Sequence, residues 1–221
     1  MSDLSFDERV ERTHRVLRGA ADAFRGKLAI VSSFGAESAV LLHLAASVAP
    51  DTPVIFLNTG KHFAQTLSYR KKLAAEFGLA DVRDIRPDVA TLSRADPRGD
   101  LWRRDPDACC AIRKVRPLSE ALDGFDAWIS GRKRFQGGLR GALPVFEASK
   151  GAVKVNPLAA WTMDDIETYG VRFRLPAHPL VEQGFASIGC WPCTKPVEAG
   201  ARARSGRWRG SEKTECGIHQ I

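Results

Sequence analysis

Four short strand-like runs, separated by segments of helix length, constrain the fold of this chain more than any other feature. The runs span residues 28–33, 52–58, 81–85 and 125–130. Strands that alternate with helices favour a parallel sheet joined by right-handed crossovers. We therefore predict an α/β protein built around a parallel sheet.

Helix signals lie between and around these runs. A capping box of Ser5 and Glu8 opens a first helix that ends near Gly26, and SAVLLHLAASV predicts a second, over 38–48. A third helix is expected over about 63–77, with Gly78 at its C-terminal cap.

The second half of the chain gives weaker signals. Residues 87–106 contain several turn-forming residues, and Asp107 can cap a helix that carries a cysteine pair, before Pro117 bends or restarts it. PVFEA and VKVNP predict two short strands, and Thr162 with Asp165 predicts a cap for a helix through Tyr169. We expect one α/β domain over 1–196 and a flexible tail over 197–221.

Composition limits the environment and the class of ligand. The formal charge is +7, and no apolar run approaches the roughly 20 residues that span a bilayer. The N-terminus is charged from its third residue, so we expect a cytoplasmic protein that does not bind membranes. The basic residues suit nucleic acid or a small polyanion. Because aromatic residues do not interleave with them, we favour a small anion and expect no nucleic-acid partner.

Three loops at the carboxyl ends of the expected strands suit an anion. The first, 32–38, joins a strand to a helix, where small residues and free backbone N–H groups can bind phosphate. The second contains Thr59, Gly60 and Lys61, and the third is the basic GRKRFQGGLR at 131–140. Open α/β sheets bind ligands at this edge. Each loop alone is weak evidence for an anion site, because a helix cap, an ordinary turn or a solvated run of charges can show the same sequence pattern.

Four of the five cysteines form two close pairs in the sequence, and the fifth stands alone. Cys109 and Cys110 are adjacent, and Cys190 and Cys193 form a CxxC pair. Four thiolates could bind zinc or an iron–sulfur cluster, although a redox dithiol and buried structural thiols are alternatives. Cys216 stands alone in ECGIH, where His219 and Lys213 could favour its thiolate as a nucleophile.

Taken together, these motifs resemble the assimilatory adenylyl-sulfate (APS) and phosphoadenylyl-sulfate (PAPS) reductases. The resemblance runs from SSFGAES through NTG, CCAIRKVRPL, GRKRFQ and SIGCWPCTKPV to ECGIH. The four paired cysteines mark the iron–sulfur branch, which is similar to the APS-using enzymes. This resemblance implies a Rossmann-like fold of the adenine nucleotide alpha-hydrolase (PP-loop) type, a parallel sheet with helices on both faces. It also implies a cytoplasmic enzyme of sulfate assimilation and cysteine biosynthesis.

The resemblance also implies roles for individual residues. Cys216 would attack the sulfur of APS, releasing AMP, and a thioredoxin- or glutaredoxin-type thiol would then release sulfite. One [4Fe-4S] cluster per chain would be bound by Cys109, Cys110, Cys190 and Cys193. The expected substrate-binding residues are Ser33, Gly35, Glu37, Ser38, Thr59, Gly60, Lys114, Arg132, Arg134, Arg140 and His219. We also expect a homo-oligomer.

Two positions depart from the resemblance, and other functions remain open. Asn58 stands where many members have Asp, and GGLRG follows Gln136 without the serine common in relatives. PAPS, or both nucleotides, could be the substrate. An ATP-pyrophosphatase-type sulfur transferase acting on nucleic acid is a second class of enzyme, but it does not explain ECGIH. A non-catalytic zinc- or cluster-binding module is a third class.

Overall fold

A six-stranded sheet forms the centre of the molecule in the computed structural model, which describes residues 4–149, 151–198, 200–210 and 213–219. The strand order is β3-β2-β1-β4-β6-β5. The strands are β1 (Leu28–Val31), β2 (Val54–Leu57), β3 (Val82–Ile85), β4 (Ala127–Ser130), β5 (Phe146–Ser149) and β6 (Ala152–Val155). Neighbours from β3 to β6 pair in parallel, whereas β5 and β6 form an antiparallel hairpin at one edge. The predicted parallel sheet is confirmed, with this one reversed strand.

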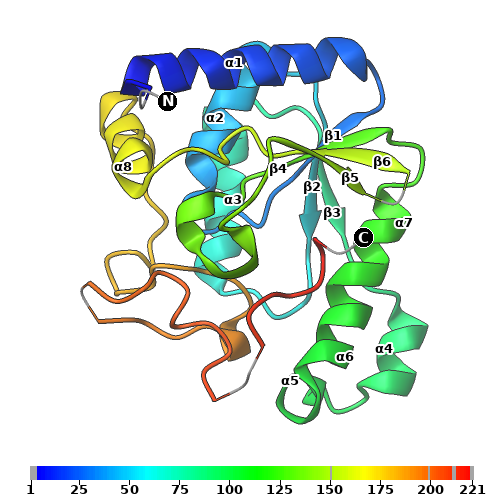
Figure 1. The fold of residues 1–221 in the computed structure, drawn as a ribbon. Helices are drawn as coiled ribbons and strands as arrows, with labels where there is room; N and C mark the ends of the chain where they lie inside the picture. Colours follow the sequence, from blue (N-terminus) through cyan, green and yellow to red (C-terminus); the bar gives the residue numbers. More distant parts are fainter. Residues whose placement is uncertain (1–3, 150, 199, 211–212, 220–221) are drawn as a thin grey trace.

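Helices cover both faces of the sheet (Figure 1). One face packs on α1 (Phe6–Ala23), α2 (Ser38–Val48), α3 (Ala64–Glu76) and α8 (Met163–Arg172). The other face packs on α7 (Arg116–Ala121), with Trp128, Ile55 and Leu118 in its core. Buried β2 residues therefore alternate between two cores, as expected for a strand that has helices on both sides.

The predicted caps at Ser5 and Thr162 are both present. Each forms a full capping box, with Glu8 and with Asp165. Gly78 has φ +62°, and the N–H of Leu79 donates to the carbonyl of Ala74, so this end of α3 takes the left-handed turn that glycine permits. The helix after Thr162 extends beyond the expected Tyr169.

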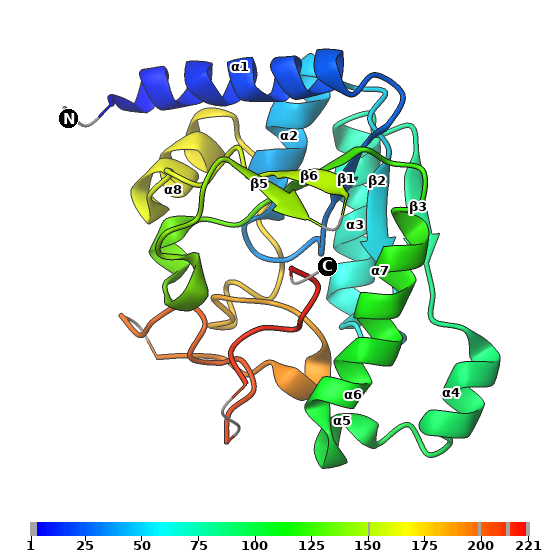
Figure 2. The same ribbon diagram turned by 45° about the vertical axis from the view of Figure 1, so that its right-hand side comes forward.

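Two sequence predictions between 87 and 117 are wrong in detail. Residues 87–106 contain α4 (Val89–Ala95) and α5 (Leu101–Arg104), as well as turns. Helix α6 (Pro106–Cys110) is capped by Asp105, whose carboxylate accepts from the N–H of Ala108 at 2.9 Å, and not by Asp107. Pro106 at the first helical position explains the shift, since that position needs no N–H. A π-helical turn (Ala111–Val115) then links α6 to α7 (Figure 2).

The last part of the described chain has little regular structure and lies at the carboxyl ends of the strands (Figures 1 and 2). An isolated bridge pairs Thr194 with Arg207, and Trp208 is buried. Ile218 packs beside the core formed by Trp128 and Leu118. The proposed boundary between 196 and 197 and the mobility of the tail remain predictions. None of the helices in the described ranges is long and apolar enough to cross a membrane.

Candidate active site

One cavity of about 190 Å³ is lined by the first and the third of the predicted loops. Its lining contains most of the residues predicted to bind substrate: Ser33, Gly35, Glu37, Ser38, Lys114, Arg132, Arg140 and His219. Cys216 lines the same cavity. The candidate nucleophile and the candidate anion site therefore come together from opposite ends of the sequence.

The loop between β1 and α2 is shaped by one strained residue and one close contact. Phe34 has φ +48°, is fully buried and packs edge-on against Phe56 at 5.6 Å. A Cβ on Gly35 would lie 3.0 Å from the carbonyl oxygen of Ile188. A side chain at position 35 would therefore crowd segment 186–189, which glycine lets the loop approach closely. The first turn of α2 has no side-chain cap, so its N–H groups suit an anion.

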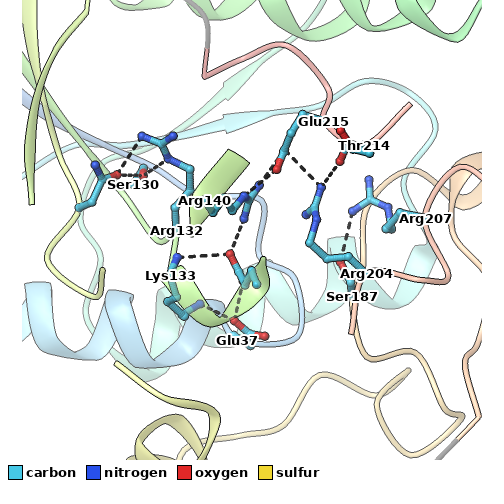
Figure 3. Close-up of polar contacts among 12 residues, drawn as sticks. Glu37, Ser130, Arg132, Lys133, Arg140, Ser187, Arg204, Arg207, Thr214 and Glu215 are labelled. Atoms are coloured by element: carbon cyan, nitrogen blue, oxygen red, sulfur yellow. Dashed lines mark hydrogen bonds and ion pairs between the residues drawn. The ribbon is translucent and has the colours of Figure 1, made fainter. Parts of the chain in front are cut away.

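The third loop, after β4, supplies buried positive charge. Arg132 pairs with Glu147 and donates through Nη2 to the Asn156 side chain at 3.2 Å. Burial lowers the pKa of Arg132, although Glu147 opposes that effect. Lys133, which the sequence placed only among the basic residues of this loop, pairs with Glu37 inside the cavity (Figure 3).

Three of the predicted substrate-binding residues lie outside the described lining. Arg134 turns away, and its Nε donates to the carbonyl of Leu143 at 2.8 Å, so it fastens the loop. The hydroxyl of Thr59 contacts Cys190 Sγ at 3.2 Å, on the cysteine side of the molecule. Gly60 donates its N–H to the Asn58 side chain at 3.2 Å, and Asn58 also reaches Asp84. Asn58 thus organises its own turn.

Two arginines of the C-terminal segment were missed as site residues. Arg204 and Arg207 both line the cavity, together with Ser187 (Figure 3). Burial, and then the neighbouring Arg140, lower the pKa of Arg204 to about 10. The signal was visible as the basic run ARARSGRWRG, but nothing in the sequence indicates that this run folds back over the sheet.

The tail reaches the cavity through close contacts. Gly217 has φ +83°, and a Cβ there would lie 3.3 Å from Val115 Cγ2. The Lys154 ammonium donates to the carbonyl of His219 at 2.9 Å, and the His219 ring stacks on Trp128. Burial, followed by the nearby Arg132, holds the pKa of His219 well below its usual value. These effects disfavour the protonated form of His219, the form in which it could favour a thiolate at Cys216.

The four paired cysteines line a second, small cavity beside the first. Lys114 lines both cavities and hydrogen-bonds to Cys190. Although burial opposes the effect, Lys114 lowers the pKa of Cys190, whereas burial raises the pKa of Cys110 to about 12. Within the described ranges, no three His, Cys, Asp or Glu side chains lie close enough to hold a single metal ion. Four thiols around one cavity, beside a cation, nevertheless fit the donor set of an iron–sulfur cluster.

A mostly parallel α/β sheet with helices on both faces, whose strands end at a cavity lined by basic residues, has the Rossmann-like architecture. Residues 27–196 match the family described as "Phosphoadenosine phosphosulfate reductase domain", and the chain belongs to this family.

Relatives and solved structures agree with this assignment. The chain is 54% identical to an adenosine 5'-phosphosulfate reductase of Mesorhizobium japonicum over 91% of its own length and 80% of that protein. It is 44% identical to a phosphoadenosine 5'-phosphosulfate reductase of Gloeobacter violaceus, over 92% and 87%. The PAPS reductase structure from Candida auris superposes with a TM-score of 0.69 at 28% identity, covering 89% of this chain and 99% of that one. A Candida glabrata FMN adenylyltransferase (TM-score 0.61, 13% identity, 97% and 77% covered) shares the fold alone. The predicted family and PP-loop-type fold are confirmed.

Proposed function

We propose that this chain is an adenylyl-sulfate reductase that converts APS to sulfite and AMP in sulfate assimilation. The observation that carries the proposal is that Cys216 lines the same cavity as the loop of Ser33 to Ser38 and as Arg132 and Arg140. A nucleophile beside a site for two anionic groups is what attack on a phosphosulfate requires. The names of the relatives at 54% and 50% identity support APS as the substrate.

The first step is transfer of a sulfo group. The Cys216 thiolate attacks the sulfur of APS, an S–S bond forms, the S–O bond to the phosphate breaks, and AMP leaves with the electron pair. The protein has little covalent chemistry to supply beyond the thiolate. Its buried cations and the free N–H groups of α2 hold the two anionic groups of the substrate and reduce their repulsion.

The second step is thiol exchange. A thiolate of a reduced thioredoxin- or glutaredoxin-type partner attacks Cys216 Sγ, and sulfite leaves with the bonding electrons. The partner's second thiol then resolves the mixed disulfide, so the dithiol is oxidised while sulfur is reduced from sulfate to sulfite level. Cys216 returns as a thiolate.

The cofactor we propose is one [4Fe-4S] cluster, held by Cys109, Cys110, Cys190 and Cys193. Such a cluster, when bound, supplies a fixed centre of charge and a rigid link between two loops. Lys114 lines both cavities, so this side chain is suited to couple the cysteines to the substrate. Iron and sulfide analysis with a visible absorption spectrum separates this cluster from zinc; stoichiometric zinc without sulfide contradicts it.

Intact-mass measurement tests the mechanism. APS added to the reduced chain without a thiol donor is expected to add the mass of one SO₃ group at Cys216, and reduced thioredoxin should remove it. The variant Cys216→Ser should take up no adduct, because serine is a far weaker nucleophile at neutral pH. An adduct that survives this substitution contradicts the proposal.

PAPS is a second candidate substrate, favoured by the name of the relative from Gloeobacter violaceus at 44% identity. Comparing kcat/KM for the two nucleotides with the same thioredoxin decides between them. A strong preference for PAPS overturns our assignment of APS.

A further inference from the structure

The carboxylate of Glu215, the residue before the candidate nucleophile, is held between two arginines of the cavity (Figure 3). Arg140 donates to it through Nε at 2.7 Å and Nη2 at 2.8 Å, and Arg204 lies at 3.2 Å through Nη2. Arg204 also donates to the carbonyl of Thr214 at 2.7 Å. We call Glu215, Arg140 and Arg204 the glutamate clamp.

The clamp is largely removed from solvent. The side chains of Arg140, Glu215 and Arg204 are 10%, 17% and 19% exposed. A bidentate arginine–carboxylate pair is among the stronger polar contacts in proteins, and breaking one in a buried setting is costly. Glu215 also screens two guanidinium groups from each other, and their proximity helps to lower the pKa of Arg204.

The tail has further contacts on both sides of Cys216. Before it, Lys213 pairs with Asp107 of α6. After it, Lys154 donates to the carbonyl of His219. The clamp lies between these contacts and directly adjoins the cysteine. It therefore restrains the backbone from which the thiol projects into the cavity.

We propose that Glu215 is a positioning residue for Cys216, which the clamp holds in place for attack on the substrate. This inference rests on the function proposed above. While the clamp is closed, other cations that line the cavity remain available to bind the substrate. Arg207 donates to two neutral acceptors, the Ser187 hydroxyl and the Cys193 carbonyl, and Lys114 contacts the Cys190 thiol. An anion can therefore bind without displacing Glu215.

The test compares Glu215→Gln with Glu198→Gln, which makes the same change at an exposed position of the same segment. We expect backbone amides in peptides containing Cys216 to exchange hydrogen at least about tenfold faster in Glu215→Gln, because the clamp opens more often. Single-turnover S-sulfonation at saturating APS should fall at least about tenfold, whereas the Kd for AMP should change less than about threefold. Glu198→Gln should match the wild type in all three measurements.

Other results overturn the proposal. Tighter AMP binding together with faster S-sulfonation in Glu215→Gln means that Glu215 competes with the substrate for the arginines. If Glu215→Gln changes neither the hydrogen exchange around Cys216 nor the rate of S-sulfonation, the clamp does not position Cys216. The shorter Glu215→Asp keeps the charge and should give an intermediate rate, which also serves as the test if Glu215→Gln does not fold. Hydrogen exchange needs no substrate, so it judges the clamp even if the wild type forms no adduct with APS.

Discussion

The carboxylate of Asp96 is fully buried and meets an almost equally buried guanidinium from Arg113 at 2.7 Å. Although burial opposes ionisation, the hydrogen bonds from Arg113 and from the N–H of Leu101 keep the pKa of Asp96 below its usual value. Arg113 also donates to the carbonyl of Thr59, next to the hydroxyl that contacts Cys190. Arg113 therefore joins the π-helical turn that follows the cysteine pair to two other segments, the one between α4 and α5 and the loop after β2.

Removal of this carboxylate should be strongly destabilising. We expect Asp96→Ala to lower the free energy of unfolding by about 3–5 kcal/mol, because it leaves a buried guanidinium unpaired. Urea denaturation measures the change. The control is Asp100→Ala, which removes a half-exposed carboxylate paired with Arg104 and should cost under about 1 kcal/mol. Equal effects of the two substitutions would show that burial of the Asp96 pair contributes nothing.

At the scale of secondary-structure elements, the short helix α6 places the two adjacent cysteines. An α-helix alone points neighbouring side chains about 100° apart, so their joint use depends on local geometry. The helix begins at Pro106, and the π-helical turn follows directly after Cys110. Such turns occur often at functional sites, because they re-aim side chains within a helix.

The two candidate caps of α6 can be told apart experimentally. Asp105→Ala should cost about 1 kcal/mol, because it removes the acceptor for the N–H of Ala108. Asp107→Ala should cost under about 1 kcal/mol, because this side chain is 82% exposed and makes a surface ion pair with Lys213. Chemical denaturation of both variants gives the comparison. A larger loss for Asp107→Ala would favour the cap that the sequence alone suggested.

At the scale of the whole molecule, buried polar contacts such as that of His178 join helix α3 to the irregular segment that follows α8. This ring is fully buried, and its Nδ1 accepts from the N–H of Leu180 at 3.1 Å, so its Nε2 carries the proton that faces Thr66. If Nδ1 were protonated, its N–H would face the N–H of Leu180, so two donors would meet without an acceptor. Burial lowers the pKa of His178 to about 4.

This histidine should make folding sensitive to acid. Between its ordinary pKa of about 6.5 and its folded value, the unfolded chain binds the proton and the folded chain does not, so stability falls as the pH drops through that interval. The loss saturates below about pH 4, at up to about 3 kcal/mol. His178→Gln should flatten the dependence relative to the wild type when unfolding is measured from pH 7 to pH 4. If the pH dependence of stability is the same in the variant and the wild type, the folded state does not lower the pKa of His178.

Much of this molecule could be predicted from local patterns. The strands, the caps at Ser5 and Thr162 and the edge of the sheet that forms the cavity follow from periodicity, side-chain hydrogen bonding and the rule for open α/β sheets. The cap at Asp105 is harder to predict, because Asp107 is also a possible cap. The preference of Pro106 for the first helical position separates the two. The roles of Arg204 and Glu215 could not be predicted, because they depend on a segment of irregular structure folding back across the sheet.

The positive φ of Gly217 has a stereochemical consequence for chemical synthesis. L-residues disfavour that backbone conformation, whereas a D-residue has the mirror-image preference. A synthetic peptide that begins with Cys216 can be ligated through this cysteine to the segment that precedes it. Chemical synthesis can therefore place a D-residue at position 217, beside the nucleophile. Genetic substitution there can introduce only L-residues, which disfavour this backbone conformation.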